Sequence, residues 1–123
     1  MNVVDSSGWL EFFAGTDRAK YYEQPLLDSE QLLVPVICLY EVFKTVSRQR
    51  SETEALQAVA AMQHGRVVEL SVTLSLSAAQ LSLEFSLPMA DSLILATARS
   101  YDALVWTQDS DFEGLTDVRY FPK

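Results

Sequence analysis

The amino-acid sequence predicts an α/β fold in which helices cover both faces of a small, mainly parallel β-sheet. Short apolar runs typical of buried strands recur along the 123-residue chain, and longer helical patterns lie between them. Parallel strands are joined by crossover helices, so this alternation favours a parallel sheet. The composition is that of a globular protein, with 49% hydrophobic and 21% charged residues, and no repeat or linker interrupts it. We therefore expect one domain over residues 1–123.

The first half of the chain is expected to contain two strands and three helices. An apolar run opens the chain, and proline, which lacks an N–H donor, is expected to end two of the later elements. In order, the elements are a strand at 2–5, a helix at about 7–14, a helix in TDRAKYYEQPLL ended near Pro25, a strand in QLLVP stopped by Pro35, and a long helix in VICLYEVFKTVSRQR.

The second half is expected to contain three helices and three strands. Ser51 and Glu54 form the Ser-x-x-Glu pattern of a capping box, which predicts the start of a helix with Gly65 as its C-cap. The remaining elements are a strand in RVVEL, a helix in SVTLSLSAAQLSLEFSL up to Pro88, a helix in MADSLILATARSYD, a strand in ALVWT and a short last strand in VRYF.

Apolar run lengths and cysteine usage limit the class of protein. No apolar run approaches the roughly 18 residues of a membrane span, and the N-terminus lacks the pattern of a signal peptide. The single cysteine, Cys38, excludes an internal disulfide bond, so we expect a cytoplasmic protein without membrane association. His64, the single histidine, lies near a predicted helix end and is expected to be structural, like Cys38. A cysteine protease is therefore not expected.

The formal net charge of −8 at pH 7 limits how the chain could bind nucleic acid. Proteins bind the phosphate backbone mainly by neutralising it with Lys and Arg side chains. Either this protein does not bind nucleic acid, or another group supplies the positive charge. Metal ions could supply it if acidic residues cluster in the fold.

Four aspartates are expected near the edge of the sheet at which parallel α/β sheets bind their ligands. Asp5 follows the first strand, while Asp109, with Asp111 close behind, follows ALVWT. Asp91 begins a helix that is apolar on nearly every face. Binding sites of such sheets lie outside the carboxyl ends of the strands, where the strand order reverses. Each acid alone is also explained as a turn or N-cap residue, but a convergent set would repel unless a cation held it together.

Helical periodicity leaves Glu41 undecided. Glu41 falls nearly opposite the apolar face of its helix, beside Lys44, with which it would form a weak surface pair. Ile37 and Cys38 lie on the same side as Glu41, so both faces of the first half of this helix could be covered. The apolar face expected from a rotation of 100° per residue consists of Val36, Leu39, Tyr40, Phe43 and Val46.

Four segments together resemble those of PIN-domain ribonucleases, most closely the VapC-type toxins of bacterial toxin–antitoxin modules. They are VVDSSGWLEFF, VPVICLYEVFKTV, LPMADSLILATA and LVWTQDSDFEGL, in the right order and at the right separation. The resemblance covers essentially the whole chain and implies a PIN-like three-layer α/β/α sandwich. The family's four near-invariant acids correspond to Asp5, Glu41, Asp91 and Asp109. Its auxiliary acid and polar positions match Ser6, Thr107 and Asp111.

The resemblance implies a metal-dependent endoribonuclease that acts as a toxin, with RNA as its substrate. Carboxylates without His or Cys suit Mg²⁺, with Mn²⁺ as a substitute. Such an ion would activate water for hydrolysis of a phosphodiester bond, and the family reaction leaves 5′-phosphate and 3′-hydroxyl ends. The expected direct ligands are Asp5, Asp91 and Asp109. Glu41 would act through water or on a second ion, and Asp111 is a further candidate ligand.

Asp109 and Asp111 are expected to have different roles. Asp109 follows Thr107, the last residue of its strand, by two residues and should still point over the sheet edge toward Asp5. Phe112 is expected to turn the chain into the core behind Asp111. The Asp111 carboxylate would then support the site from a distance or cap the turn in DFEGL.

The resemblance also implies a homodimer and a heteromeric complex with a VapB-like antitoxin. The tail of that antitoxin would lie across the active site, where an Arg or Lys side chain would compete with the metal ion. The aromatic residues that could form a groove for its apolar side chains are Trp9, Phe12, Phe13, Tyr21 and Tyr22, although aromatic residues at helical spacing more often belong to the core.

Other functions fit the sequence less well. A haloacid-dehalogenase-type phosphatase requires an aspartate at the position of Ser7, and a receiver domain requires an acidic pair and a late lysine that are not evident. The alternative that remains is a catalytically silent PIN-like interaction module. The presence of all four acids speaks against it.

Overall fold

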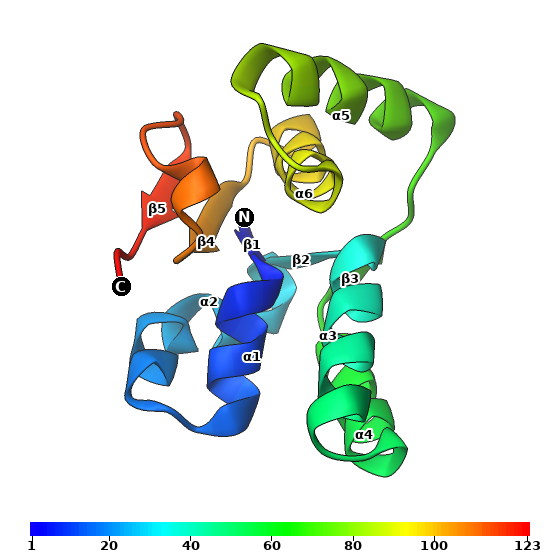
Figure 1. The fold of residues 1–123 in the computed structure, drawn as a ribbon, viewed down its shortest axis with the longest axis vertical. Helices are drawn as coiled ribbons and strands as arrows, with labels where there is room; N and C mark the ends of the chain where they lie inside the picture. The colour runs from blue at the N-terminus through cyan, green and yellow to red at the C-terminus, as the bar shows by residue number, and fades with distance from the viewer.

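The computed structural model describes residues 1–123 and contains a five-stranded β-sheet in which every pairing is parallel. Its strand order is β3-β2-β1-β4-β5, and the sheet runs through the middle of the molecule (Figure 1). The strands are β1 (Asn2–Val4), β2 (Leu32–Pro35), β3 (Arg66–Val68), β4 (Leu104–Thr107) and β5 (Val118–Tyr120).

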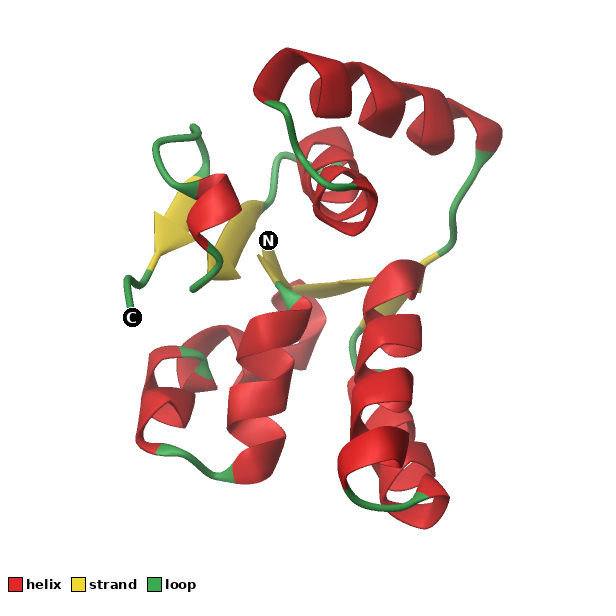
Figure 2. Ribbon diagram, in the orientation of Figure 1, coloured by secondary structure: helices red, strands yellow, loops and turns green.

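Helices cover both faces of the sheet, which confirms the predicted three-layer α/β/α sandwich (Figure 2). One face carries α5 (Val72–Phe85) and α6 (Met89–Ser100). The other face carries α1 (Ser6–Ala14), α2 (Glu23–Leu27), α3 (Val36–Gln49) and α4 (Glu52–Met62). The short 3₁₀ helices are η1 (Asp17–Tyr21), η2 (Ser29–Gln31) and η3 (Ser110–Phe112). Taken singly, no helix has the length and apolar composition to cross a membrane, although α5 and α6 together, bent by 115°, would pass that test.

The strand order reverses beside β1. After β1 the chain adds β2 and β3 on one side, and β4 and β5 then extend the sheet on the other. Open parallel sheets form a crevice at such a point, outside the carboxyl ends of the strands. The backbone N–H of Asp5, directly after β1, donates to the Trp106 carbonyl oxygen in β4 at 2.9 Å. The ends of β1 and β4 therefore meet at the expected crevice.

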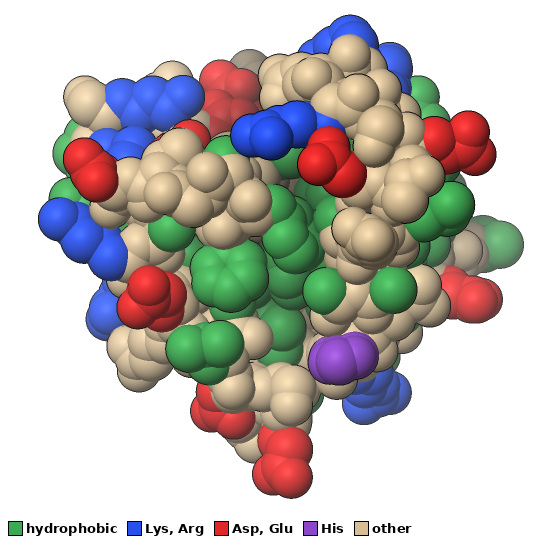
Figure 3. Space-filling model, turned by 90° about the horizontal axis from the view of Figure 1, so that it is seen from below, with side chains coloured by type: hydrophobic (Ala, Val, Ile, Leu, Met, Phe, Trp, Pro, Cys, Tyr) green, Lys and Arg blue, Asp and Glu red, His purple; other side chains and the backbone are tan.

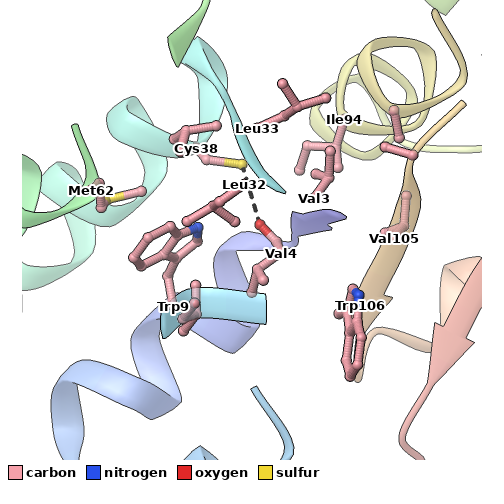
Figure 4. Close-up of a cluster of buried hydrophobic side chains, with 14 of the residues drawn as sticks. Val3, Val4, Trp9, Leu32, Leu33, Cys38, Met62, Ile94, Val105 and Trp106 are labelled. Atoms are coloured by element: carbon pink, nitrogen blue, oxygen red, sulfur yellow. Dashed lines mark hydrogen bonds between the residues drawn. The ribbon is translucent and has the colours of Figure 1, made fainter. Parts of the chain in front are cut away.

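The hydrophobic core packs around the central strands that lead to this crevice (Figure 4). Val3, Val4 and Val105 are fully buried, and each such side chain stabilises the fold by about 1.5–3 kcal/mol. Cys38 in α3 is also fully buried, and its Sγ atom lies 3.9 Å from the Val4 carbonyl oxygen. Burial raises the pKa of the Cys38 thiol. The thiol is therefore an inert part of the core, as predicted.

Two of the aromatic residues that were considered for either a partner groove or the core belong to the core. Trp9 is 3% exposed and Tyr22 is fully buried, in agreement with the core assignment that their helical spacing favoured. Tyr22 packs against Gly8, where an added Cβ would lie 2.7 Å from the Tyr22 ring and from a Val4 methyl group. Glycine at this position lets α1 approach β1 closely, and the aromatic side chains fill the layer beneath the strand.

Three helix ends that were predicted from the sequence can be compared with the structure. Ser51 caps α4 by accepting the backbone N–H of Glu54 at 3.1 Å, as predicted. Pro25 does not end a helix; it lies in the first turn of α2, where the N–H that proline lacks would have no intrahelical partner. Gly65 is not the C-cap of α4, which is Gln63. Gly65 is needed instead for close packing, because an added Cβ would approach a Val34 methyl group at 3.0 Å.

Candidate active site

Asp5 lies between β1 and α1 as the N-cap residue of α1, but its carboxylate caps no backbone N–H. The side chain is 3% exposed, and its Oδ2 atom accepts hydrogen bonds from the hydroxyls of Ser7 at 2.8 Å and Thr107 at 2.9 Å. The Oδ1 atom accepts no hydrogen bond from the protein. A buried carboxylate with an unpaired oxygen is costly, so the start of the helix does not explain Asp5.

A chain of hydrogen bonds connects Asp5 to Asp109. Thr107, expected as a supporting residue, is fully buried at the end of β4 and donates its hydroxyl proton to Asp5. The same hydroxyl oxygen accepts the backbone N–H of Asp109 at 2.9 Å. Thr107 therefore holds the segment after β4 against the end of β1.

Three of the acids predicted from the sequence lie close together at the end of this chain of hydrogen bonds. Asp91, Asp109 and Asp111 each place a carboxylate oxygen within 4.8 Å of the others. Asp91 lies in the first turn of α6 and is 8% exposed, whereas Asp109 is partly buried and Asp111 is exposed. Asp5 is outside this group of three, but its charge acts on Asp91. The fold thus brings acids from three distant segments to the crevice.

The cap of the turn after β4 is Asp109, so the expectation that Asp111 caps it is wrong. Asp109 is the N-cap residue of η3, and its Oδ1 atom accepts the backbone N–H of Asp111 at 2.9 Å. The short segment between Thr107 and Phe112 begins its 3₁₀ turn one residue after Asp109, which places Asp109 at the cap. The Asp111 carboxylate caps no backbone N–H; it hydrogen-bonds to the carboxyl group of Asp91, and this contact helps to raise the pKa of Asp91.

Glu41 points toward the same end of the sheet. It is partly buried, and its Oε1 atom accepts the hydroxyl of Ser6 at 2.7 Å. The apolar face expected for α3 is wrong in part, because Tyr40 is 60% exposed while Cys38 and Val42 are fully buried. Lys44 lies over the Tyr40 ring at 5.7 Å instead of pairing with Glu41. The helix covers the sheet with the side that carries Cys38 and Val42, and this brings Glu41 to the edge of the site.

The buried acids have raised pKa values. Burial is the largest cause that raises the pKa of Asp5 from 3.8 to about 6; the charges of Asp109 and Glu41 act in the same direction, and the hydrogen bonds from Ser7 and Thr107 oppose them. Burial also raises the pKa of Asp91, and the charges of Asp5 and Asp109 add to this effect. No Lys, Arg or His side chain is among the groups that act on these two carboxyls. The protein itself therefore leaves this negative charge uncompensated.

The residues present fit a hard divalent cation. The site offers carboxylate oxygens only, which is the ligand chemistry that Mg²⁺ and Mn²⁺ prefer. The Oδ1 atom of Asp5 and the Oδ2 atom of Asp109 accept no hydrogen bond from the protein and are free to act as ligands. The Asp91 carboxyl group hydrogen-bonds to that of Asp111, a contact that a bound cation would replace. Cys38 lies in the core and donates to a backbone carbonyl. No soft ligand competes for the ion.

Without metal, the stability of the protein is expected to fall as the pH rises from about 4 to about 6. The pKa of Asp5 is raised to about 6 in the folded state, so in this range the folded state binds more protons than the unfolded state. The free energy of unfolding then decreases with pH, by about 3 kcal/mol for a shift of this size. Thermal melts in EDTA measure the effect. The part of the pH dependence that comes from Asp5 should be absent in Asp5→Asn. If the wild type and Asp5→Asn showed the same dependence of stability on pH, the raised pKa would not belong to Asp5.

Sequence reasoning missed three polar residues at the site. Ser7 donates to Asp5, and the signal for it was a hydroxyl two residues after an acid, a spacing typical of local side-chain bonds. Gln108, between Thr107 and Asp109, is 6% exposed and accepts the Nε–H of Arg18 at 2.6 Å. No local sequence signal could have joined Arg18 to Gln108, because they are 90 residues apart.

Comparisons with solved structures find the same fold in other proteins. A toxin–antitoxin complex from Klebsiella pneumoniae contains a chain that is 21% identical, with a TM-score of 0.81 and 100% of both chains covered. VapC20 from Mycobacterium tuberculosis, described as a sarcin–ricin loop cleaving toxin, is 20% identical with a TM-score of 0.78, covering 97% of this chain and 99% of its own. The DNA-bound VapBC of Salmonella typhimurium is 16% identical with a TM-score of 0.77, covering 98% and 96%.

These solved structures establish the fold, and a sequence comparison with curated proteins finds no match. A family model described as the PIN domain matches residues 3–117, from β1 to the residue before β5. The matched range includes all five acids of the site. The chain belongs to the PIN domain family.

Proposed function

We propose that this chain is a metal-dependent endoribonuclease, the toxin of a toxin–antitoxin pair, acting in the cytoplasm as a single PIN domain over residues 1–123. The observation that carries the proposal is the convergence of Asp91, Asp109 and Asp111, together with the buried Asp5, whose charge acts on Asp91 and whose Oδ1 atom accepts no hydrogen bond from the protein. This arrangement lies where the strand order reverses, and no basic side chain compensates it. Membership of the PIN family and the likeness to VapC toxins support it.

Each acid has a role in this proposal. A bound Mg²⁺ or Mn²⁺ ion would supply the charge that neutralises the phosphate and activates a water molecule. Asp5, Asp91 and Asp109 would hold the ion, with Asp111 as a further ligand on the exposed side; Asp91, Asp109 and Asp111 lie within reach of one ion, and the charge of Asp5 acts on Asp91. Glu41, which accepts the Ser6 hydroxyl, would act through water or on a second ion. Ser7 and Thr107 both donate to the Oδ2 atom of Asp5 and leave its Oδ1 atom free to bind an ion.

The test is cleavage of single-stranded RNA by the purified chain with defined metal ions. We expect cleavage with Mg²⁺ or Mn²⁺, no cleavage in EDTA, and product ends that are 5′-phosphate and 3′-hydroxyl. The same ions should raise the melting temperature, because they bind the folded site and relieve the repulsion between its acids. RNA that stays intact at every concentration of either ion, with the fold preserved, would favour the silent interaction module.

We also propose an antitoxin partner and a homodimer, because several structural neighbours are toxin–antitoxin complexes. On the face formed by α1–α4, hydrophobic side chains gather in a hollow (Figure 3). A cavity of about 350 Å³ between α1, α3 and α4, lined in part by Leu10, Phe13 and Val46, would take apolar side chains of the antitoxin tail. Val72, Leu76 and Leu83 form an exposed apolar stripe on α5 that would serve the homodimer. Sedimentation of the chain alone and with its antitoxin measures both assemblies.

The negative charge of the site indicates how the antitoxin tail would inhibit RNA cleavage. An Arg or Lys side chain of the tail would enter the carboxylate cluster and compete with the metal ion. Calorimetric titration of the tail into the wild type, with and without Mg²⁺, should show weaker binding when the ion is present. Equal binding by a variant with Asp5, Glu41, Asp91 and Asp109 all changed to Ala would replace this mode with a purely apolar one.

A further inference from the structure

A second cavity adjoins the carboxylate site and has a different chemical character. Its volume is about 390 Å³, within the roughly 300–1,000 Å³ of small-molecule sites. Its lining is mostly polar, and Asp109 is the only acidic residue in it. The lining consists of Ser7, Gln108, Asp109, Ser110, Tyr120 and Lys123.

Gln108 is the most constrained polar side chain in this cavity. It is 6% exposed, and Arg18 donates its Nε–H to the Gln108 side-chain oxygen at 2.6 Å. Because Arg carries only donors, the atom that faces it must be the amide oxygen. The amide nitrogen of Gln108 donates to no protein acceptor, and it is not among the sealed, unpartnered polar atoms of the core. The cavity is therefore lined by a fixed side chain with a free N–H₂ donor.

Arg18 is itself held in place, which makes this wall of the cavity rigid. Its second donor group, Nη2, donates to the Phe121 carbonyl oxygen at 2.8 Å. The Tyr21 ring lies 5.3 Å from the Arg18 guanidinium and stacks on Phe121, with 4.9 Å between ring centroids. The backbone N–H of Phe121 in turn donates to the Thr107 carbonyl oxygen at 2.8 Å. The donor on Gln108 is thus preorganised by the same segments that hold Asp109.

We propose that this cavity is a nucleotide subsite that holds the RNA unit next to the bond that is cleaved; this inference rests on the proposed function. The Gln108 amide nitrogen and the Ser110 hydroxyl donate to oxygens of the neighbouring phosphate or ribose. The Lys123 ammonium neutralises that phosphate, and the Tyr120 ring offers a face on which a base stacks.

The donor groups that line the cavity, and not the overall charge of the chain, favour RNA over a protein partner as the occupant. The chain carries a net charge of −8, and metal ions neutralise only the phosphate at the carboxylate site. A neighbouring phosphate needs its own donors, and Lys123 with Gln108 are placed beside Asp109 to provide them. The cavity also combines an aromatic ring with hydroxyl and amide donors, which is the set that binds single-stranded nucleotides.

The experiment measures binding separately from cleavage. Fluorescence anisotropy with a labelled single-stranded RNA, in Mg²⁺ and in an Asp5→Asn background that leaves the RNA intact, gives the dissociation constant. Gln108→Glu keeps the shape of the side chain but replaces the free donor with an acceptor. We expect it to weaken RNA binding about 10- to 100-fold, as for loss of a hydrogen bond to a charged group. Gln80→Glu, the same change at an exposed position on α5, is the matched control and should have no effect.

Lys123→Gln provides a second variant, at an exposed position where the fold is not at risk. It should reduce the slope of log Kd against log salt concentration by about 0.7, the value for one phosphate contact with a single strand. In otherwise wild-type protein, both variants should raise KM more than they lower kcat. The melting temperature of Lys123→Gln should stay unchanged, which separates binding from a structural role at this exposed position.

The outcomes distinguish this inference from the proposed function. RNA binding by Gln108→Glu equal to that of Gln80→Glu, or an unchanged salt slope for Lys123→Gln, overturns the subsite even if the wild type cleaves RNA. Loss of binding in both variants supports the subsite even if the wild type proves inactive, in which case only the nuclease proposal fails. If a basic peptide bound in the cavity and RNA did not, the cavity would be assigned to a protein partner and the proposal would be overturned.

Discussion

Asp5→Asn is expected to reduce RNA cleavage below detection while leaving the fold intact. Asn keeps the oxygen that accepts hydrogen bonds from Ser7 and Thr107, but it removes the charge that binds the metal ion. The pKa of Asp5 is raised to about 6 by burial, so removing the charge should stabilise the metal-free protein at neutral pH by up to about 3 kcal/mol. Loss of activity together with a gain in stability is a pair of effects that simple misfolding cannot produce.

Asp28→Asn is the matched control, because Asp28 is an exposed carboxylate that precedes β2 rather than following a strand. Its cleavage rate and melting temperature should equal those of the wild type. The measurements are RNA cleavage in Mg²⁺ and thermal melts in EDTA at neutral pH. Cleavage by Asp5→Asn near the wild-type rate would remove Asp5 from the mechanism.

Asp109→Asn is expected to be inactive at every attainable Mn²⁺ concentration, whereas Asp111→Asn should keep part of its activity. Asp109 is held by its N–H bond to Thr107 and by its bond to the Asp111 N–H, so its free oxygen is preorganised for the ion. Asp111 is exposed, and its carboxyl group hydrogen-bonds to that of Asp91, so it supports a neighbouring ligand. Loss of a supporting acid typically costs 10- to 100-fold, and added metal should recover part of that loss.

The two variants can be compared directly because Asn preserves the local structure at Asp109. The side-chain oxygen of Asn can still accept the Asp111 N–H that starts η3. A Mn²⁺ titration of RNA cleavage for each variant, with thermal melts alongside, is the measurement. Recovery of Asp109→Asn by metal, with Asp111→Asn inactive throughout, would show that the two roles are reversed.

Much of the fold follows from the sequence because its signals are local. Apolar runs predict all five strands, and the capping box at Ser51 correctly marks the start of α4. The alternation of strands and helices predicts the parallel sheet, since crossover helices must cover both of its faces. The errors at Pro25 and Gly65 have one cause. Proline can end a helix or lie in its first turn, and glycine can cap a helix or allow close packing. Which of the two applies depends on the neighbouring residues in the fold.

The acidic residues of the site, and the strand ends that carry Asp5 and Asp109, can be predicted from the local sequence. How those acids are held, and which of them are neighbours, depends on the packing of the whole chain. This packing turned the Cys38 side of α3 toward the sheet and so brought Glu41 to Ser6. It placed Asp109 at the N-cap of η3, so the Asp111 carboxylate caps no backbone N–H. The physical reason is that these contacts join residues far apart in the chain, whose distances are set by packing of the core and not by local periodicity.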